Sequence, residues 1–333
     1  MSDSLLPYAV GAAKRARRVA VRMRRRVERL HTAPALGSGI RPRPLLRPVH
    51  FSVLGGRTMN VALLAPGALA IASANLELIR GGQRHRIVLE PESQSDGSRL
   101  LTATTALSHA DHPETGTSGI ALSSGLWRMS VVIVGEDGRE MRAGVAAATV
   151  RTTDGPTLPV SPSPRSGAQF RLMRSVDGLA ILKVRAPDHQ AELDSFDLRW
   201  DRITVRGRLI ASHAAPTSYA AQAVRRGSGA VVEAPVEWRG DTFTFDLPLA
   251  AMASGRRTQR WDVQLQHGRT RLKIARRLTD VRRRNQVFRT SFRIIALENG
   301  SLLRVHAYIT SAGALAVSCA EFEGAHDGAK EVA

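Results

Sequence analysis

The stretch "FDLRWDRITV", residues 196–205, decides the fold class because its apolar and charged residues alternate. Phe196, Leu198 and Trp200 fall on one side of an extended chain, and Asp197, Arg199 and Asp201 fall on the other. The stretch "DTFTFDLPL", residues 241–249, alternates in the same way. A period of two predicts β-strands with one buried face, so we expect the apolar residues of both stretches to point into a core.

The chain from residue 53 to residue 308 shows the same period of two in its apolar residues. Strand-sized runs are separated by turn signals, of which "VDG" at 176–178 and "ENG" at 298–300 are the strongest. Asp-Gly and Asn-Gly supply the positive φ angles that tight hairpins need. No stretch alternates a strand with a long helix, which argues against a parallel α/β sheet. We therefore predict an all-β protein.

Two pairs of similar hairpins indicate a duplicated domain. "LWRMSVVIVGEDGREMRAGVAA" (126–147) resembles "RWDVQLQHGRTRLKIARR" (260–277), with Trp127 matching Trp261. "QFRLMRSVDGLAILKVR" (169–185) resembles "SFRIIALENGSLLRVHA" (291–307), with Phe170 matching Phe292 at an offset of 122 residues. We expect two tandem immunoglobulin-like β-sandwich domains, over residues 51–188 and 189–312, followed by a tail at 313–333.

The positive charge of the chain is concentrated in two places. The formal net charge is +19, of which residues 14–29 carry +8 and residues 256–293 carry +11. The remainder of the chain is therefore neutral in aggregate. Aromatic residues make up 5% of the sequence, which argues against a surface that binds bases or sugars by repeated stacking.

The N-terminal basic stretch "KRARRVAVRMRRRVERL", residues 14–30, has helical periodicity. Its apolar residues form a narrow stripe beside a wide cationic face, which is typical of a helix lying in a membrane interface. We expect an amphipathic helix over residues 1–31 and a proline-rich linker over 32–50, because 31–49 holds four prolines. The expected membrane-surface residues are Lys14, Arg15, Arg18, Arg22, Arg25, Arg26 and Arg29.

A second basic stretch, the arginine segment, is "ARRLTDVRRRNQVFR" at residues 275–289. It joins two expected strands. Asp280 is its only acidic residue, and guanidinium groups match phosphate oxygens in bidentate geometry. The connection "TTDGPTLPVSPSPRSG" at 152–167 in the first repeat has one arginine and four prolines. A solvated loop is the alternative to a polyanion-binding surface. The candidate binding residues are Arg276, Arg277, Arg282, Arg283, Arg284 and Arg289.

Other residue groups offer weaker candidates. His109 and His112 in "HADH" lack a third metal ligand nearby, so a solvated loop is the simpler interpretation. Cys319 would need a base to act as a nucleophile, and we expect an idle or partly buried thiol. The carboxylates of Asp197 and Asp201 flank Arg199 and favour a surface ladder of paired charges over acid–base catalysis.

The tryptophans and the motif search give no enzyme site. Trp127 and Trp261 begin equivalent strands, which favours a role in the sandwich core over a sugar-stacking platform. No Walker loop, GxSxG elbow or GxGxxG fingerprint occurs in the sequence. We therefore expect no catalytic residue, no metal site and no cofactor.

The lines "FDLRWDRITVRGRL" (196–209) and "FRIIALENGSLLRVHA" (292–307) resemble the accessory β-domains of actinobacterial CDP-glycerol glycerophosphotransferase proteins. Those are teichoic-acid-type polymerases and related envelope glycosyltransferases. The resemblance covers roughly residues 50–310 and implies a role in envelope polymer assembly at the cytoplasmic face of the membrane. The nucleotide-binding α/β domain of that family has no counterpart here, so only the accessory part carries over.

These features together predict a non-catalytic, polyanion-binding accessory protein, peripheral at the inner face of the cell membrane. Its expected partners are an anionic lipid or a phosphate-rich polymer, with a catalytic transferase as a further partner. A nucleic-acid-binding protein using the same basic patches is the first alternative, although its typical motifs are missing. An accessory part of a transferase, with a site assembled from loops, is the second.

Overall fold

The structure is a computed structural model that describes residues 44–65, 70–114, 119–148, 155–212, 214–253, 257–297 and 300–322. Nearly all regular structure in these residues is β-strand, so the prediction of an all-β protein is confirmed. The described helices are each three or four residues long, and none is long and apolar enough to cross a membrane. The expected basic helix at 1–31 lies outside the described residues.

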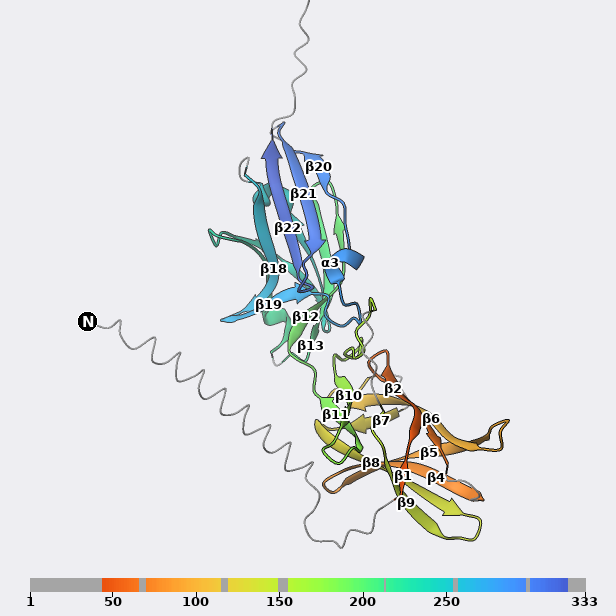
Figure 1. Cartoon of the computed structure of the whole chain (residues 1–333). Coiled ribbons are helices and arrows are strands. Elements are labelled where there is room, and N and C mark those ends of the chain that lie inside the picture. Colours follow the sequence, from red (N-terminus) through yellow and green to blue (C-terminus); the bar gives the residue numbers. More distant parts are fainter. Residues whose placement is uncertain are drawn as a thin grey trace, which may run out of the picture. The chain divides into compact units, whose positions relative to one another are not determined.

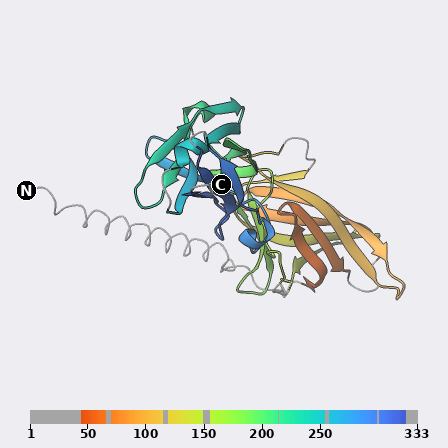
Figure 2. The same cartoon turned by 90° about the horizontal axis from the view of Figure 1, so that it is seen from above.

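The chain divides into two compact units (Figure 1). Unit 1 comprises described residues up to Asp111, those of 115–151, and Phe170–Arg185. Unit 2 comprises His112–Glu114, the described residues of 152–169, and those from Ala186 onward. In the view turned by 90°, the strands run in colour from red at the start of unit 1 to blue at the end of unit 2 (Figure 2).

Unit 1 follows the strand order β1-β9-β8-β4-β5-β6-β3-β2. Strand β11 also pairs with β8, β10 pairs with β11, and β7 pairs with β6. The elements are β1 Leu45–Leu46, β2 Pro48–Leu54, β3 Thr58–Leu64, β4 Ile71–Arg80, β5 Gln83–Ser93, β6 Arg99–His109, β7 Gly119–Leu122, β8 Gly125–Gly135, β9 Glu140–Val145, β10 Gln169–Arg174 and β11 Ala180–Arg185.

Unit 2 follows the order β16-β17-β13-β12-β19-β18-β22-β21-β20, with β14 on β18 and β15 on β14. The elements are β12 Gln190–Leu198, β13 Arg202–Ile210, η1 Pro216–Ser218, β14 Ala220–Arg225, β15 Val231–Ala234, β16 Val236–Arg239, β17 Thr242–Pro248, α2 Leu249–Met252, β18 Gln259–His267, β19 Thr270–Ala275, α3 Arg284–Val287, β20 Arg293–Ala296, β21 Leu302–Ile309 and β22 Leu315–Phe322. Strands β18, β22 and β21 lie side by side (Figure 1).

One hydrophobic core lies between the strand layers of unit 2. Phe243, Phe245 and Leu247 on β17 are buried in it, as their alternation with polar residues predicts. Leu198 is buried as well, but Trp200 is 77% exposed, so its expected inward orientation is wrong. Trp200 lies past the end of β12, in the turn before β13, where the alternation of the strand no longer directs the side chain.

The two units repeat the same strand pairings. Trp127 on β8 lies opposite Leu182 on β11, and Trp261 on β18 lies opposite Val317 on β22. The first strand of each unit pairs in parallel with the strand that follows the tryptophan strand, β1 with β9 and β12 with β19. Trp127 and Trp261 are 0% and 2% exposed, so both are core residues as expected.

The structure corrects the register of the repeat. The partner of the β10–β11 hairpin is β21–β22, because Leu182 and Val317 both face the tryptophan and are 135 residues apart. The expected partner was the β20–β21 hairpin, at an offset of 122 residues. The three turns resemble one another, because Gly178, Gly300 and Gly313 each have a positive φ and donate a backbone hydrogen bond across a short turn.

Two expected boundaries are corrected as well. Residues 315–322, expected in a tail, form β22, which pairs with β18 on one side and with β21 on the other. Residues 45–46 and 48–50, expected in the linker, lie in β1 and β2. Strand β22 forms a hairpin with β21, and β2 forms one with β3, so each segment pairs with the strand next to it in the chain.

Candidate functional site

The arginine segment is fixed to unit 2 at its start by Glu192 on β12. This carboxylate is 4% exposed and accepts hydrogen bonds from the backbone N–H of Arg277 (3.0 Å to each oxygen) and of Leu278 (2.9 Å). Burial raises the pKa of Glu192, and the two backbone donors and nearby Arg208 offset only part of that effect. A buried acceptor therefore holds the backbone of a basic loop in place.

The middle of the segment is fixed by the proline-rich connection that the sequence comparison set against it. Leu158 donates its backbone N–H to the carbonyl of Asp280 (2.6 Å), and Arg282 donates its own to the carbonyl of Pro156 (2.9 Å). Thr157 and Val281 form an isolated β-bridge between these bonds. The two connections thus pack against each other within unit 2, and neither is an isolated loop.

The six candidate arginines differ in exposure and in the contacts that they make. Arg276 donates to the carbonyl oxygen of Asp194 (2.6 Å) and lies 4.5 Å over the ring of Phe288, so its guanidinium is used structurally. Arg284 starts α3 and its buried Nε has no hydrogen-bond partner among the described residues. Arg282 is half-buried and has partners of its own. The structure therefore does not bring all six together on one open surface.

Arg277, Arg283 and Arg289 are the exposed members of the set. None of their guanidinium groups makes an ion pair or hydrogen bond with any residue that the structure describes. Arginines elsewhere contrast with them. Three surround the buried Glu77 in unit 1, at 3.1 to 3.6 Å, namely Arg84, Arg86 and Arg142. Arg226 and Lys273 both bind Asp262 in unit 2.

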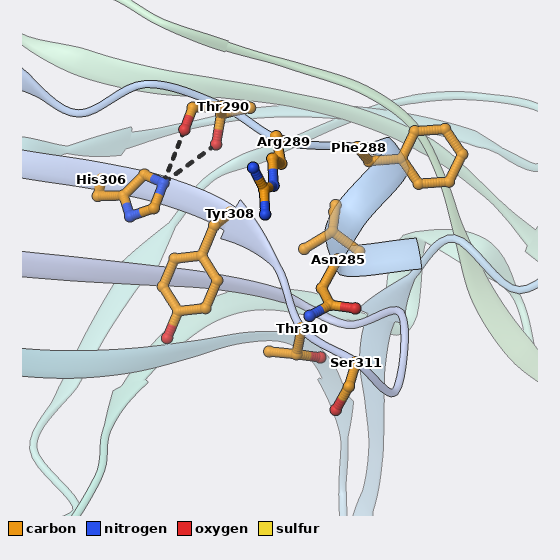
Figure 3. Close-up of a pocket in the computed structure, with 9 residues that line it drawn as sticks. Asn285, Phe288, Arg289, Thr290, His306, Tyr308, Thr310 and Ser311 are labelled. Atoms are coloured by element: carbon orange, nitrogen blue, oxygen red, sulfur yellow. Dashed lines mark hydrogen bonds between the residues drawn. The ribbon is translucent and has the colours of Figure 1, made fainter. Parts of the chain in front are cut away.

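A pocket of about 550 Å³ lies beside α3, at the end of the arginine segment. Arg289 extends toward the space between Tyr308 and Asn285 (Figure 3). Nε2 of His306 lies 3.0 Å from the carbonyl oxygen of Thr290, which can only accept, so Nε2 carries the ring proton. The lining residues are Asn285, Phe288, Arg289, Thr290, His306, Tyr308, Ile309, Thr310 and Ser311.

Of these residues, only Arg289 is a candidate binding residue from the sequence alone. The missed side chains of β21, His306 and Tyr308, alternate with the buried Val305, Ala307 and Ile309. The sequence pattern that could have found them is a strand with aromatic and basic residues at its outward positions. The position of this strand beside α3 cannot be predicted from the sequence, because it depends on strand pairing.

A smaller pocket of about 300 Å³ contains charges of both signs. Glu192 and Asp194 line it together with Arg208 and Arg276. Nε of Arg208 lies 3.9 Å from Oδ1 of Asp194. Because its cations face carboxylates, this pocket is a poorer anion site than the one beside α3.

The weaker candidates are buried or form ion pairs. His109 is fully buried in β6, so the expected solvated loop is wrong for it, and no group of three metal-ligating side chains occurs among the described residues. Cys319 is 2% exposed and burial raises the pKa of its thiol to about 12. Asp197 pairs with Arg199 at 3.2 Å, whereas Asp201 pairs with Arg202 at 2.9 Å.

Comparisons with known proteins leave the family open. No family model matches the chain, and no curated protein matches it. Among solved structures it is similar to S. aureus TarS, at 8% identity and a TM-score of 0.31, over 69% of this chain and 39% of that one. A structure of TarS 217–571 gives 8% and 0.30, with 61% of its length covered. A pullulanase from Anoxybacillus sp. LM18-11, complexed with maltotriose, gives 8% and 0.17 over 68% of this chain and 24% of that one. The chain spans less than two thirds of each of these structures.

Proposed function

We propose that this chain is a non-catalytic accessory protein that binds polyanions through unit 2. The proposal rests on the exposure and the lack of pairing of three cations. The side chains of Arg277, Arg283 and Arg289 are exposed and have no ion pair among the described residues. The backbone of Arg277 is held by Glu192, and that of Arg282, the neighbour of Arg283, is held by Pro156, so the segment that carries these cations is anchored at two points. Guanidinium groups held in this way favour phosphate, whose oxygens accept two parallel N–H bonds.

We extend the proposal to the inner surface of the cell membrane through the basic stretch at 14–30. Each basic residue close to an anionic membrane contributes about 1 kcal/mol to binding, so a stretch carrying +8 localises a chain despite a thin apolar stripe. The attraction weakens as salt screens the surface charge.

The envelope context of the proposal comes from the resemblance of the two units to accessory β-domains of envelope polymerases. Under this proposal the units are immunoglobulin-like sandwiches, the polyanion is an anionic lipid or a phosphate-rich envelope polymer, and a separate transferase supplies the catalysis.

The binding of inorganic polyphosphate by the full-length chain tests the site in unit 2. We expect the variant R277A/R283A to bind at least tenfold more weakly, with the slope of log affinity against log salt reduced by about two. The matched control is R206A/R239A, which removes the same charge from two exposed arginines on β13 and β16. Equal weakening by both variants would reduce the effect to net charge and overturn the site.

Sedimentation with anionic and neutral vesicles tests the membrane part. We expect the full chain to bind anionic vesicles only, and the variant R18Q/R22Q/R25Q to lose most of that binding. Vesicle binding that survives these substitutions would contradict the role of the stretch. Binding to single-stranded DNA with higher affinity than to polyphosphate would favour the nucleic-acid alternative.

A further inference from the structure

The pocket beside α3 holds several hydrogen-bond donors that the fold does not use. The side chains of Asn285, Arg289, Tyr308 and Ser311 line it and make no hydrogen bond with any residue that the structure describes. Donors that converge on one space without partners in the protein are available to a ligand. The first property required of that ligand is therefore a high density of acceptor oxygens.

The charge of the lining residues further restricts the chemical class of the ligand. Arg289 is a cation, and none of the nine lining residues is an aspartate or a glutamate. This composition distinguishes the pocket from its smaller neighbour, where Glu192 and Asp194 face the arginines. An anionic group with several oxygens, such as a phosphate ester, satisfies Arg289 and the amide of Asn285 together.

The rings on β21 give the pocket an apolar side. His306 and Tyr308 stack with their centroids 5.0 Å apart and their planes 29° from parallel. Thr290 holds the ring of His306 through Nε2, and the ring of Tyr308 packs against it (Figure 3). An aromatic surface beside hydroxyl groups suits the C–H face and the hydroxyls of a sugar ring.

We propose that this pocket binds a phosphorylated sugar. Its phosphate lies against Arg289 and Asn285, its ring lies along Tyr308, and its hydroxyls meet Thr310 and Ser311. The volume of about 550 Å³ is within the range of small-molecule sites, roughly 300–1,000 Å³. The inference rests on the proposed function in one respect, because both place an anionic group at Arg289.

Calorimetric titration of the full-length chain with glucose 1-phosphate, glucose and inorganic phosphate tests the pocket. We expect glucose 1-phosphate to bind at least tenfold more tightly than either fragment. N285D places a carboxylate against the phosphate with almost no change of volume, and we expect it to weaken glucose 1-phosphate binding at least tenfold. We expect Y308A to bring its affinity down to that of inorganic phosphate.

The outcomes separate this inference from the polyanion proposal. Loss of glucose 1-phosphate binding in N285D, with polyphosphate binding by the same variant unchanged, supports the pocket as a separate subsite. Unchanged glucose 1-phosphate binding in both N285D and Y308A overturns the inference, as does no binding by the unmodified chain. If R277A/R283A binds polyphosphate normally but N285D loses glucose 1-phosphate, the polyanion proposal fails while the pocket stands.

Discussion

At the scale of single residues, Glu192 is the clearest case of a side chain that stabilises the backbone of a neighbouring segment. It is buried on β12, and its two oxygens hold the backbone where the arginine segment leaves β19. The carboxylate is a better acceptor when ionised, but burial opposes ionisation. The second effect is the larger, since the pKa of Glu192 is raised.

This balance predicts how Glu192 makes stability depend on pH. A carboxyl whose pKa is raised by folding binds its proton more tightly in the native state than in the unfolded state. Its contribution to the free energy of unfolding is therefore largest below about pH 4.5, its ordinary value, and falls as pH rises above it. We expect E192Q to lack this slope, so that its stability relative to the unmodified chain improves between pH 4 and pH 7.

Urea unfolding at several pH values measures that difference. E192A serves as the control, because it removes the acceptor and leaves the N–H groups of Arg277 and Leu278 unpaired. Because E192A also lacks the titrating group, we expect it to be destabilised by about 1–3 kcal/mol at pH 4 and to show the same relative improvement toward pH 7 as E192Q. A difference between E192Q and the unmodified chain that stays constant with pH would contradict the assignment of the raised pKa.

The two equivalent tryptophans predict a second contrast. Trp127 donates its Nε1–H to the carbonyl of Ser123 (2.9 Å), whereas the buried Nε1 of Trp261 has no partner among the described residues. W127F and W261F remove the same volume, but only W127F breaks a hydrogen bond. We expect W127F to cost about 1 kcal/mol more free energy of unfolding than W261F, measured by urea unfolding. Equal losses would show that the hydrogen bond adds nothing measurable.

At the scale of elements, β12 and β13 approach each other closely at Gly207. A Cβ atom there would lie 2.2 Å from the carbonyl oxygen of Glu192 and 2.5 Å from the ring of Phe243. Both neighbours are parts of the packed core of unit 2, and neither is the end of a flexible chain. We expect G207A to destabilise unit 2 by about 1–3 kcal/mol in urea unfolding.

Gly82, in the turn between β4 and β5, is the matched control for that substitution. A Cβ atom there would meet nothing within 4 Å, and Gly82 has no positive φ angle. We expect G82A to change the free energy of unfolding by less than about 0.5 kcal/mol. If G207A were equally mild, β12 and β13 would have room that their described packing does not show.

Elements also show what sequence patterns can and cannot predict. The period of two identified the strands and the buried face of β17, because alternation is a property of each strand by itself. Alternation does not predict the orientation of Trp200, which lies beyond a strand end. The turn motifs match the β20–β21 hairpin to the wrong hairpin of unit 1, because turn chemistry is local and recurs along the chain. The pocket joins α3 to β21, so Arg289 was predictable from charge, whereas Tyr308 needed the pairing of strands.

At the scale of the whole molecule, one thiol reports on the integrity of unit 2. Cys319 is the only cysteine in the chain and is buried on β22, with its pKa raised to about 12. We expect a thiol reagent at pH 8 to label the native chain very slowly and the urea-unfolded chain rapidly, because folding both covers the sulfur and suppresses the thiolate. Rapid labelling of the native chain would contradict the burial of β22.

The position of β22 has a consequence for synthesis on the ribosome. This strand fills the space between β18 and β21 but follows every other described strand of unit 2 in the sequence. Until Leu315–Phe322 leaves the exit tunnel, the edges of β18 and β21 that β22 later covers remain open, with Trp261 and Val305 on those strands lacking their neighbour. Open edges of this kind attract other nascent chains. Unit 2 is therefore a domain whose vulnerable period lasts until its last described strand has left the exit tunnel.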